Sequence, residues 1–152
     1  MTNALELLKA DHERINLLFD QIEVASHETE ARDIFDKIYD ELEIHALIEE
    51  AVFYPAFNEF IEFEDIIEES YGEHQDVKDL LAEIDETDDY DDFMKLIGEL
   101  TEDVQFHVEL EEQDLFPMVR TVLDDQALEK LGFKMNEEKD RIAHAPQSTE
   151  AA

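Results

Sequence analysis

Cysteine is absent from this chain, so disulfide bonds, zinc–thiolate sites, iron–sulfur clusters and thiol nucleophiles are excluded. Glycine and proline are scarce, with three of each among 152 residues. No apolar stretch approaches the roughly 20 residues that a membrane-spanning helix needs. The N-terminus also lacks the basic-then-apolar pattern of a secretion signal. We therefore expect a cytoplasmic protein that does not enter a membrane.

Positive charge is scarce as well. Only 11 Lys and Arg residues accompany 44 Asp and Glu residues, which gives a net charge of −33. Nucleic acids and anionic membrane surfaces are both bound through positive charge. We therefore expect neither as a partner, and the sequence identifies no protein partner.

What the chain does contain favours helices. Glutamate, leucine and alanine are plentiful, and all three have high helix propensity. Apolar residues recur at alternating intervals of three and four, which places them on one face of a helix. This spacing predicts helices over residues 3–24, 29–61, 65–86 and 90–122. Four antiparallel helices with short turns make an all-α, up-down-up-down bundle of two helical hairpins.

The predicted bundle has identifiable ends. Pro55 and Pro117 fall late in the second and fourth helices, where proline kinks or ends a helix. A short fifth helix is predicted near residues 124–131. We expect the bundle to occupy residues 1–131 and a polar tail, frayed towards its end, to occupy residues 132–152.

A histidine pattern is duplicated along the chain. His12 and His45 are 33 residues apart. His74 and His107 show the same separation, and this second pair follows the first at an offset of 62 residues (74 − 12 and 107 − 45). Each later histidine opens the phrase His-x-x-x-Glu-Glu-x-x-x-[Phe/Tyr]-Pro. The six residues that the repeat selects are His12, His45, Glu49, His74, His107 and Glu111.

Helix geometry predicts that these side chains share one layer of the bundle. The arms of each hairpin, counted from the histidine to the turn, differ by only roughly 5 Å at 1.5 Å per residue. Each of the six replaces an apolar residue in a core-facing stripe, and residues four apart neighbour each other on one face. A buried, unpartnered carboxylate costs several kcal/mol, so two in one layer indicate cations. The alternative is a polar layer without metal.

A ferritin-like site is an alternative arrangement for such a centre. Sites of that kind place a glutamate three residues before a histidine on two helices. The corresponding residues here are Lys9, Leu42, Tyr71 and Val104. None is a glutamate, which disfavours that family.

The order H…HxxxE…H…HxxxE over the first 120 or so residues resembles the hemerythrin-like (HHE cation-binding) domain family. The resemblance implies a four-helix bundle with two iron ions joined by an oxo or hydroxo bridge. Ligand type alone also fits manganese or zinc. Oxygen carriers of the family place the last carboxylate five residues after its histidine, where Glu112 stands; Glu111 repeats Glu49 and points inward better. The implied ligands are His12, His45, Glu49, His74, His107 and Glu111, with both glutamates bridging.

One departure from the oxygen carriers bears on function. Those proteins have an additional histidine one turn from the third-helix histidine, whereas Ser70 and Lys78 flank His74 here. Fewer histidines leave more metal positions open to water or small ligands, which counts against reversible oxygen storage. Tyr71, one turn before His74, is a candidate for lining the pocket, and the alternative is an ordinary core tyrosine.

Three kinds of function fit these residues. The first is a non-haem di-iron protein that binds or senses small ligands such as oxygen or nitric oxide, or that responds to iron or redox state. The second is a di-iron enzyme that acts on peroxide or oxygen, since a bound metal polarises oxygen ligands. The third is an iron-handling protein. The sequence does not decide whether the protein is an enzyme.

The acidic composition yields a test of its own. An ordinary solvated acidic surface and adaptation to a salty cytoplasm both account for the charge, and in the second case screening by salt relieves self-repulsion. If the protein is salt-adapted, its melting temperature rises steadily with added sodium chloride. A melting temperature that does not rise contradicts salt adaptation.

Overall fold

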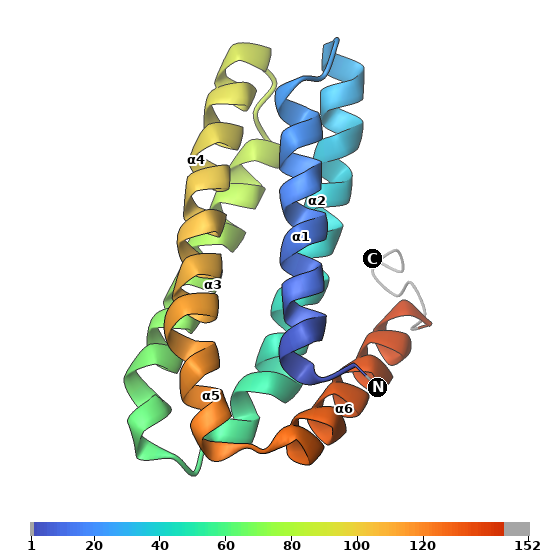
Figure 1. Cartoon of the computed structure of the whole chain (residues 1–152). Coiled ribbons are helices and arrows are strands. Elements are labelled where there is room, and N and C mark those ends of the chain that lie inside the picture. The colour runs from blue at the N-terminus through green and yellow to red at the C-terminus, as the bar shows by residue number, and fades with distance from the viewer. Residues whose placement is uncertain (1, 145–152) are drawn as a thin grey trace, which may run out of the picture.

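The computed structural model describes residues 2–144, and every regular element within that range is a helix. Four long helices form an up-down-up-down bundle (Figure 1). They are α1 (Ala4–Glu23), α2 (Glu28–Ile48), α3 (Glu64–Asp85) and α4 (Tyr90–Glu109). The predicted all-α class and bundle are confirmed. No described helix is both long and apolar enough to cross a membrane.

Side-chain caps fix where the helices begin. Asn3 accepts a hydrogen bond from the Glu6 N–H (2.9 Å), and the Glu6 carboxylate accepts one from the Asn3 N–H (3.0 Å). This reciprocal pair satisfies two backbone donors that the first turn of α1 leaves free. His27 and Asp89 each accept from an N–H three residues on, at the starts of α2 and α4. The caps thus mark the first residues of α1, α2 and α4.

Both glutamate-bearing helices change their hydrogen-bond register. α2 passes into a π-helical turn, η1 (Glu49–Phe53), and then into a 3₁₀ turn, η2 (Tyr54–Phe57). α4 passes into a longer π-helical turn, η4 (Leu110–Leu115), and then into α5 (Phe116–Val122). A 3₁₀ turn, η3 (Ile61–Phe63), leads into α3. The π turns therefore begin at or next to the glutamates of the repeated phrase.

These turns correct the continuous helices expected over 29–61 and 90–122. Apolar spacing does not reveal a single π turn, because the residues before and after it keep their helical intervals. Pro55 and Pro117 each stand in the first turn of the segment after the π turn, where a missing N–H is tolerated. The second helix then ends soon afterwards, at Phe57, as its proline predicts.

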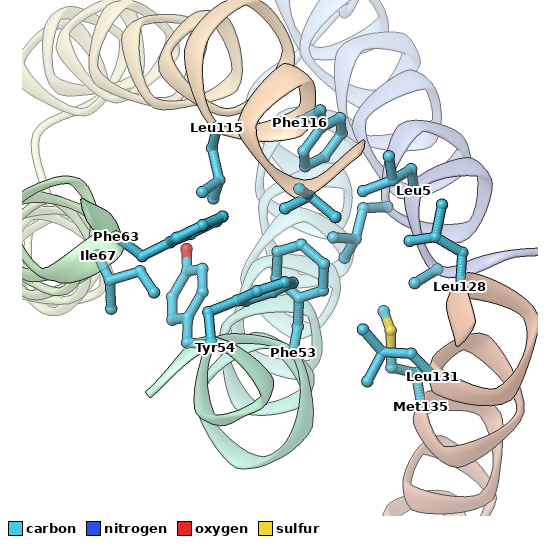
Figure 2. Close-up of a cluster of buried hydrophobic side chains, with 14 of the residues drawn as sticks. Leu5, Phe53, Tyr54, Phe63, Ile67, Leu115, Phe116, Leu128, Leu131 and Met135 are labelled. Atoms are coloured by element: carbon cyan, nitrogen blue, oxygen red, sulfur yellow. The ribbon is translucent and has the colours of Figure 1, made fainter. Parts of the chain in front are cut away.

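Two apolar clusters fill the bundle, one on each side of a polar layer. The upper cluster contains Phe93 and lies near the α1–α2 and α3–α4 turns (Figure 1). The lower cluster contains Phe116 and is shown in Figure 2. In α1, His12 stands between Leu8 of the lower cluster and Ile15 of the upper cluster. Hydrophobic burial above and below thus holds the polar layer in the middle of the bundle.

The C-terminal helix is longer than the sequence predicted. A short helix over 124–131 was expected, with a polar tail from Gly132, but α6 spans Asp125–Ala143 and runs obliquely beside the lower part of the bundle (Figure 1). The tail therefore begins no earlier than His144, and its expected frayed end, 145–152, lies outside the described residues. The side chains that α6 buries in the lower cluster are Leu128, Leu131 and Met135.

Gly132 is the first residue of the expected polar tail. It lies inside α6 at a close approach to the N-terminal segment. A Cβ at this position would lie 2.8 Å from the Thr2 carbonyl oxygen and 3.0 Å from the Ala4 nitrogen. Glycine is thus required for packing here and not for ending the helix.

This packing predicts opposite effects for two glycine substitutions. Gly98→Ala, with no atom within 4 Å of the added carbon, should stabilise the fold by about 0.5–1 kcal/mol because alanine favours helix. Gly132→Ala should destabilise it, because backbone atoms of the N-terminal segment must move. Urea unfolding of both variants measures the difference. Equal stabilisation by the two would contradict the close packing of α6 on α1.

Candidate metal centre

All six residues selected by the repeat meet in the polar layer. One histidine comes from each long helix, and the glutamates come from the two π turns. Each of the six side chains is 8% exposed or less. Among the described residues, two groups have ligand atoms within 4.8 Å of one another and can hold a metal ion. The groups are His12, His45, Glu49 and Glu111, and Glu49, His74 and His107.

Each hairpin supplies one pair of histidines, and the two pairs have nearly the same geometry. The rings of His12 and His45, the first half-site, have centroids 5.0 Å apart and planes 62° apart. The rings of His74 and His107, the second half-site, are 4.7 Å and 63° apart. The sequence repeat is therefore also a spatial repeat, with an approximate twofold relation between the half-sites.

The two glutamates lie between the half-sites. Glu49 directs Oε2 to His45 Nε2 (3.3 Å) and Oε1 to His74 Nε2 (2.9 Å). Glu111 directs Oε1 to His12 Nε2 (3.1 Å) and Oε2 to His107 Nε2 (3.3 Å). Each carboxylate therefore offers one oxygen to each half-site, which is the arrangement needed to bridge two ions.

Two buried atoms of the first half-site indicate that the donor set fits a metal ion. His45 Nε2 and Glu49 Oε2 have no hydrogen-bond partner although both are buried. Unpaired polar atoms of this kind are rare and costly in folded proteins. An ion bound between the two atoms would satisfy both. Imidazole nitrogen together with carboxylate oxygen suits iron, manganese or zinc.

In each of the four histidines of the polar layer, the second ring nitrogen, Nδ1, faces a carboxylate. Because a carboxylate only accepts, Nδ1 carries the proton and the Nε2 lone pair is free for the centre. Such partners fix ring orientation at metal sites, and losing one typically weakens metal binding by about 10–100-fold. The four pairs are Asp11–His45 (2.9 Å), Glu50–His74 (2.7 Å), Glu73–His107 (2.7 Å) and Glu112–His12 (2.6 Å).

The sequence did not predict these four carboxylates, although the repeat contains them. Asp11 and Glu73 precede the first histidine of each half by one residue, and Glu50 and Glu112 directly follow Glu49 and Glu111. All of them obey the 62-residue offset, which is the pattern that would have found them. The geometry also distinguishes Glu111, which faces the centre, from Glu112, which orients a histidine.

A buried tyrosine that the sequence also did not predict reaches the centre from the lower cluster. The Tyr54 hydroxyl lies 2.7 Å from Glu111 Oε2, 3.0 Å from Glu49 Oε1 and 3.3 Å from His74 Nε2. Its oxygen is the red atom among the apolar side chains of Figure 2. The repeat puts Phe116 at the equivalent position. The hydroxyl group therefore makes the two half-sites unequal.

Tyr71, the candidate for lining the pocket, lies outside the site. Its side chain is 40% exposed, and its ring packs edge-on against Tyr54 with centroids 5.4 Å apart. The inward position one turn before His74 belongs to Ser70, which is buried and donates a hydrogen bond to the Ile66 carbonyl. Residues three and four positions before His74 both lie about one helical turn away, and here the residue four positions before it, Ser70, faces inward.

A small cavity adjoins the four histidines on the upper side of the layer. Its volume is about 40 Å³, and a water molecule requires about 10–15 Å³ measured in this way. The space accommodates a molecule of two or three atoms. Its remaining walls are apolar and consist of Ile15, Leu42, Ala46, Val77, Val104 and Val108.

The buried carboxylates raise the proton affinity of the histidines. Burial lowers the pKa of His45, but the Glu49 carboxylate and the hydrogen bond that His45 donates to Asp11 raise it to about 10. Burial is likewise outweighed at His107, where Glu111 holds the pKa well above its usual value. Burial raises the pKa of Glu49, yet His45 and its other neighbours hold it well below the usual range. The layer therefore needs positive charge, from protons or from metal ions.

A comparison with known families matches residues 3–132 to the hemerythrin HHE cation-binding domain. An uncharacterized protein of Mycobacterium tuberculosis is 29% identical, over 97% of this chain and 91% of that protein. A crystal structure of an HHE cation-binding domain-containing protein from Mycobacterium kansasii superposes with a TM-score of 0.81 at 29% identity, covering 93% of this chain and 87% of that one.

A longer relative shares the same region. A DNA nickase of Nostoc is 28% identical over 92% of this chain, but the match covers only 40% of that protein. The chain therefore spans two fifths of the length of this relative.

The raised pKa of His45 predicts how stability without metal depends on pH. The proton bound to His45 contributes its full stabilisation below the unfolded pKa of 6.5, and this contribution is lost as the pH rises through about 10. The melting temperature of metal-free protein should therefore fall between these values. The fall should be smaller in Glu49→Gln, because this variant lacks the carboxylate charge that most raises the pKa of His45. A melting temperature that rises over this interval would show that His45 is not protonated in the fold.

Proposed function

Because this chain belongs to the hemerythrin HHE cation-binding domain family, we propose that its half-sites hold two iron ions and bind small ligands such as oxygen or nitric oxide. In this proposal the centre senses such ligands, or the iron and redox state that governs their binding. The iron pair supplies reversible electron exchange and ligand affinity, and the residues around it control orientation, protons and access.

The sharing of both carboxylates between the half-sites carries the proposal. A single-ion site would need only one group of ligands, whereas here Glu49 and Glu111 each direct one oxygen to either half-site. The ligands of the iron pair are proposed to be His12, His45, Glu49, His74, His107 and Glu111.

The surrounding residues favour ligand binding over simple metal storage. The four Nδ1 carboxylate partners hold the imidazoles in fixed orientations, so the centre is preorganised. The apolar walls of the cavity exclude most water from the side opposite Tyr54. A small molecule can therefore occupy the cavity next to the four histidines without displacing protein side chains.

A peroxide-consuming enzyme is the second candidate, and Tyr54 favours it. Cleavage of an oxygen–oxygen bond consumes protons, and the Tyr54 hydroxyl is a proton-bearing group in contact with Glu49 and Glu111. Burial and both carboxylates raise the pKa of Tyr54, so the hydroxyl keeps its proton at neutral pH. Steady hydrogen peroxide turnover by iron-loaded protein, lost in Tyr54→Phe while iron content is retained, would favour this candidate.

Metal loading and ligand uptake test the proposal together. We expect about two iron ions per chain after anaerobic loading, by elemental analysis, and uptake of nitric oxide by the reduced protein. His74→Ala should lose iron from the second half-site because a ligand is removed. His144→Ala, which changes an exposed histidine hydrogen-bonded to the Asp140 carbonyl, is the matched control and should load normally.

Two results would overturn the proposal. Protein purified from its native host with zinc in both half-sites would exclude the iron assignment. An iron-loaded protein that takes up neither oxygen nor nitric oxide would exclude ligand sensing.

A further inference from the structure

We propose that small uncharged ligands enter the centre through the α2–α3 seam, the contact between the two hairpins at Ala46 and Val77. The inference rests on the proposed function, since it concerns access to the cavity beside the same histidines. The opposite seam, between α1 and α4, is closed by larger side chains. The two seams are equivalent in the repeat, so their differences can be compared residue by residue.

The cavity is built from equivalent pairs of residues. Its apolar walls are related by the same 62-residue offset as its histidines. A cavity with this symmetry could open equally on either seam. The apolar pairs are Ile15 with Val77, Leu42 with Val104, and Ala46 with Val108.

Two of the three pairs differ in size in a way that favours the α2–α3 seam, whereas in the third Leu42 of α2 is larger than Val104 of α4. On the α2–α3 side stand Ala46 and Val77, and both are partly exposed. Their equivalents on the α1–α4 side are Val108, which is also partly exposed, and Ile15, which is only 1% exposed, and each is larger by at least one methylene. The smaller side chains leave the wall of the cavity thinner at the α2–α3 seam.

A second cavity lies outside this thinner wall. It also has a volume of about 40 Å³, and residues of α2, η1 and α3 line it. Leu42, Ala46, His74 and Val77 line both cavities. The outer cavity thus leads from the α2–α3 surface to the side chains that bound the inner one, and these four shared residues form the wall between the two cavities.

The walls and rim of the outer cavity select the class of ligand. Leu42, Val77 and Leu81 make its inner walls apolar. Glu43, Glu50 and Lys78 form its polar rim, with two negative charges and one positive charge. A rim of this kind, on a chain of net charge −33, repels anions. An uncharged diatomic gas meets no such barrier, so oxygen and nitric oxide fit the route better than azide or superoxide.

The repeat supplies a matched pair of blocking variants. Lys78 lies on the rim of the outer cavity and not in the inner one, and its equivalent on the α1–α4 side is Asn16. Both side chains are exposed, so either position accepts a large residue without disturbing the core. Lys78→Trp places bulk over the proposed entrance, and Asn16→Trp places the same bulk over the opposite seam. Lys78→Gln controls for the lost charge.

Nitric oxide binding to reduced, iron-loaded protein in stopped flow is the first measurement. A blocked entrance slows association and release equally, so Lys78→Trp should lower both by about tenfold and leave Kd unchanged. Asn16→Trp and Lys78→Gln should match the parent protein. Ala46→Leu, which fills the passage itself, should also slow association. Parent-like rates in both Lys78→Trp and Ala46→Leu, or slowing in Asn16→Trp, would overturn the route.

Xenon supplies a measurement that does not depend on iron. Crystals of the metal-free protein under xenon pressure should show xenon in the outer cavity at Ala46 and Val77, because apolar cavities bind this gas. Xenon found only at the α1–α4 seam, or nowhere between the hairpins, would overturn the route. A parent protein that loads iron but takes up no nitric oxide refutes the proposed function instead, and the xenon result then decides the route by itself.

Discussion

The structure depends on the burial of two carboxylates, Glu49 and Glu111, at the middle of an apolar bundle. Removing two negative charges from water costs several kcal/mol each unless positive charge and hydrogen bonds offset the loss. Four imidazoles surround the pair, and each imidazole is held in turn by a carboxylate nearer the surface. In this alternation of acid, imidazole and acid, either protons or metal ions would offset the charge of the buried carboxylates.

At each π turn, two consecutive glutamate side chains point to different partners. Glu49 faces the centre, whereas Glu50 reaches His74 on the other hairpin, and Glu111 and Glu112 repeat this division. The orienting bonds of Glu50 and Glu112 therefore cross between hairpins. Since π turns occur often at functional sites, their appearance at both glutamates links the local backbone geometry to the joining of the two halves.

The sequence repeat gives the two half-sites equivalent residues at most positions, and the positions where equivalent residues differ make the half-sites unequal. Tyr54 carries a hydroxyl group where the repeat puts Phe116, so only one half-site has a phenol beside it. Asp11 contacts Arg14 and Lys139 while it orients His45, whereas the second oxygen of its equivalent, Glu73, is buried without a partner. The two proposed ions would thus experience different fields, as expected of a centre in which one position binds ligand and the other supports it.

The sequence by itself determined the bundle, the layer and the six inward residues, because helical periodicity and a fixed offset are properties of the chain that survive folding. It did not reveal the π turns at Glu49 and Glu111, since one widened turn leaves the apolar intervals on either side intact. It placed Tyr71 at the pocket, because spacing alone does not tell a neighbouring face from an inward one. It ended the last helix at residue 131, because the chain turns polar from Gly132 and only packing shows that α6 continues. The sequence did not show that Tyr54 contacts the centre or that the small side chain of Ala46 lies in the wall of the cavity. Contacts between the hairpins in the tertiary structure decide which residues of the symmetric repeat contact the centre and which leave an entrance to it.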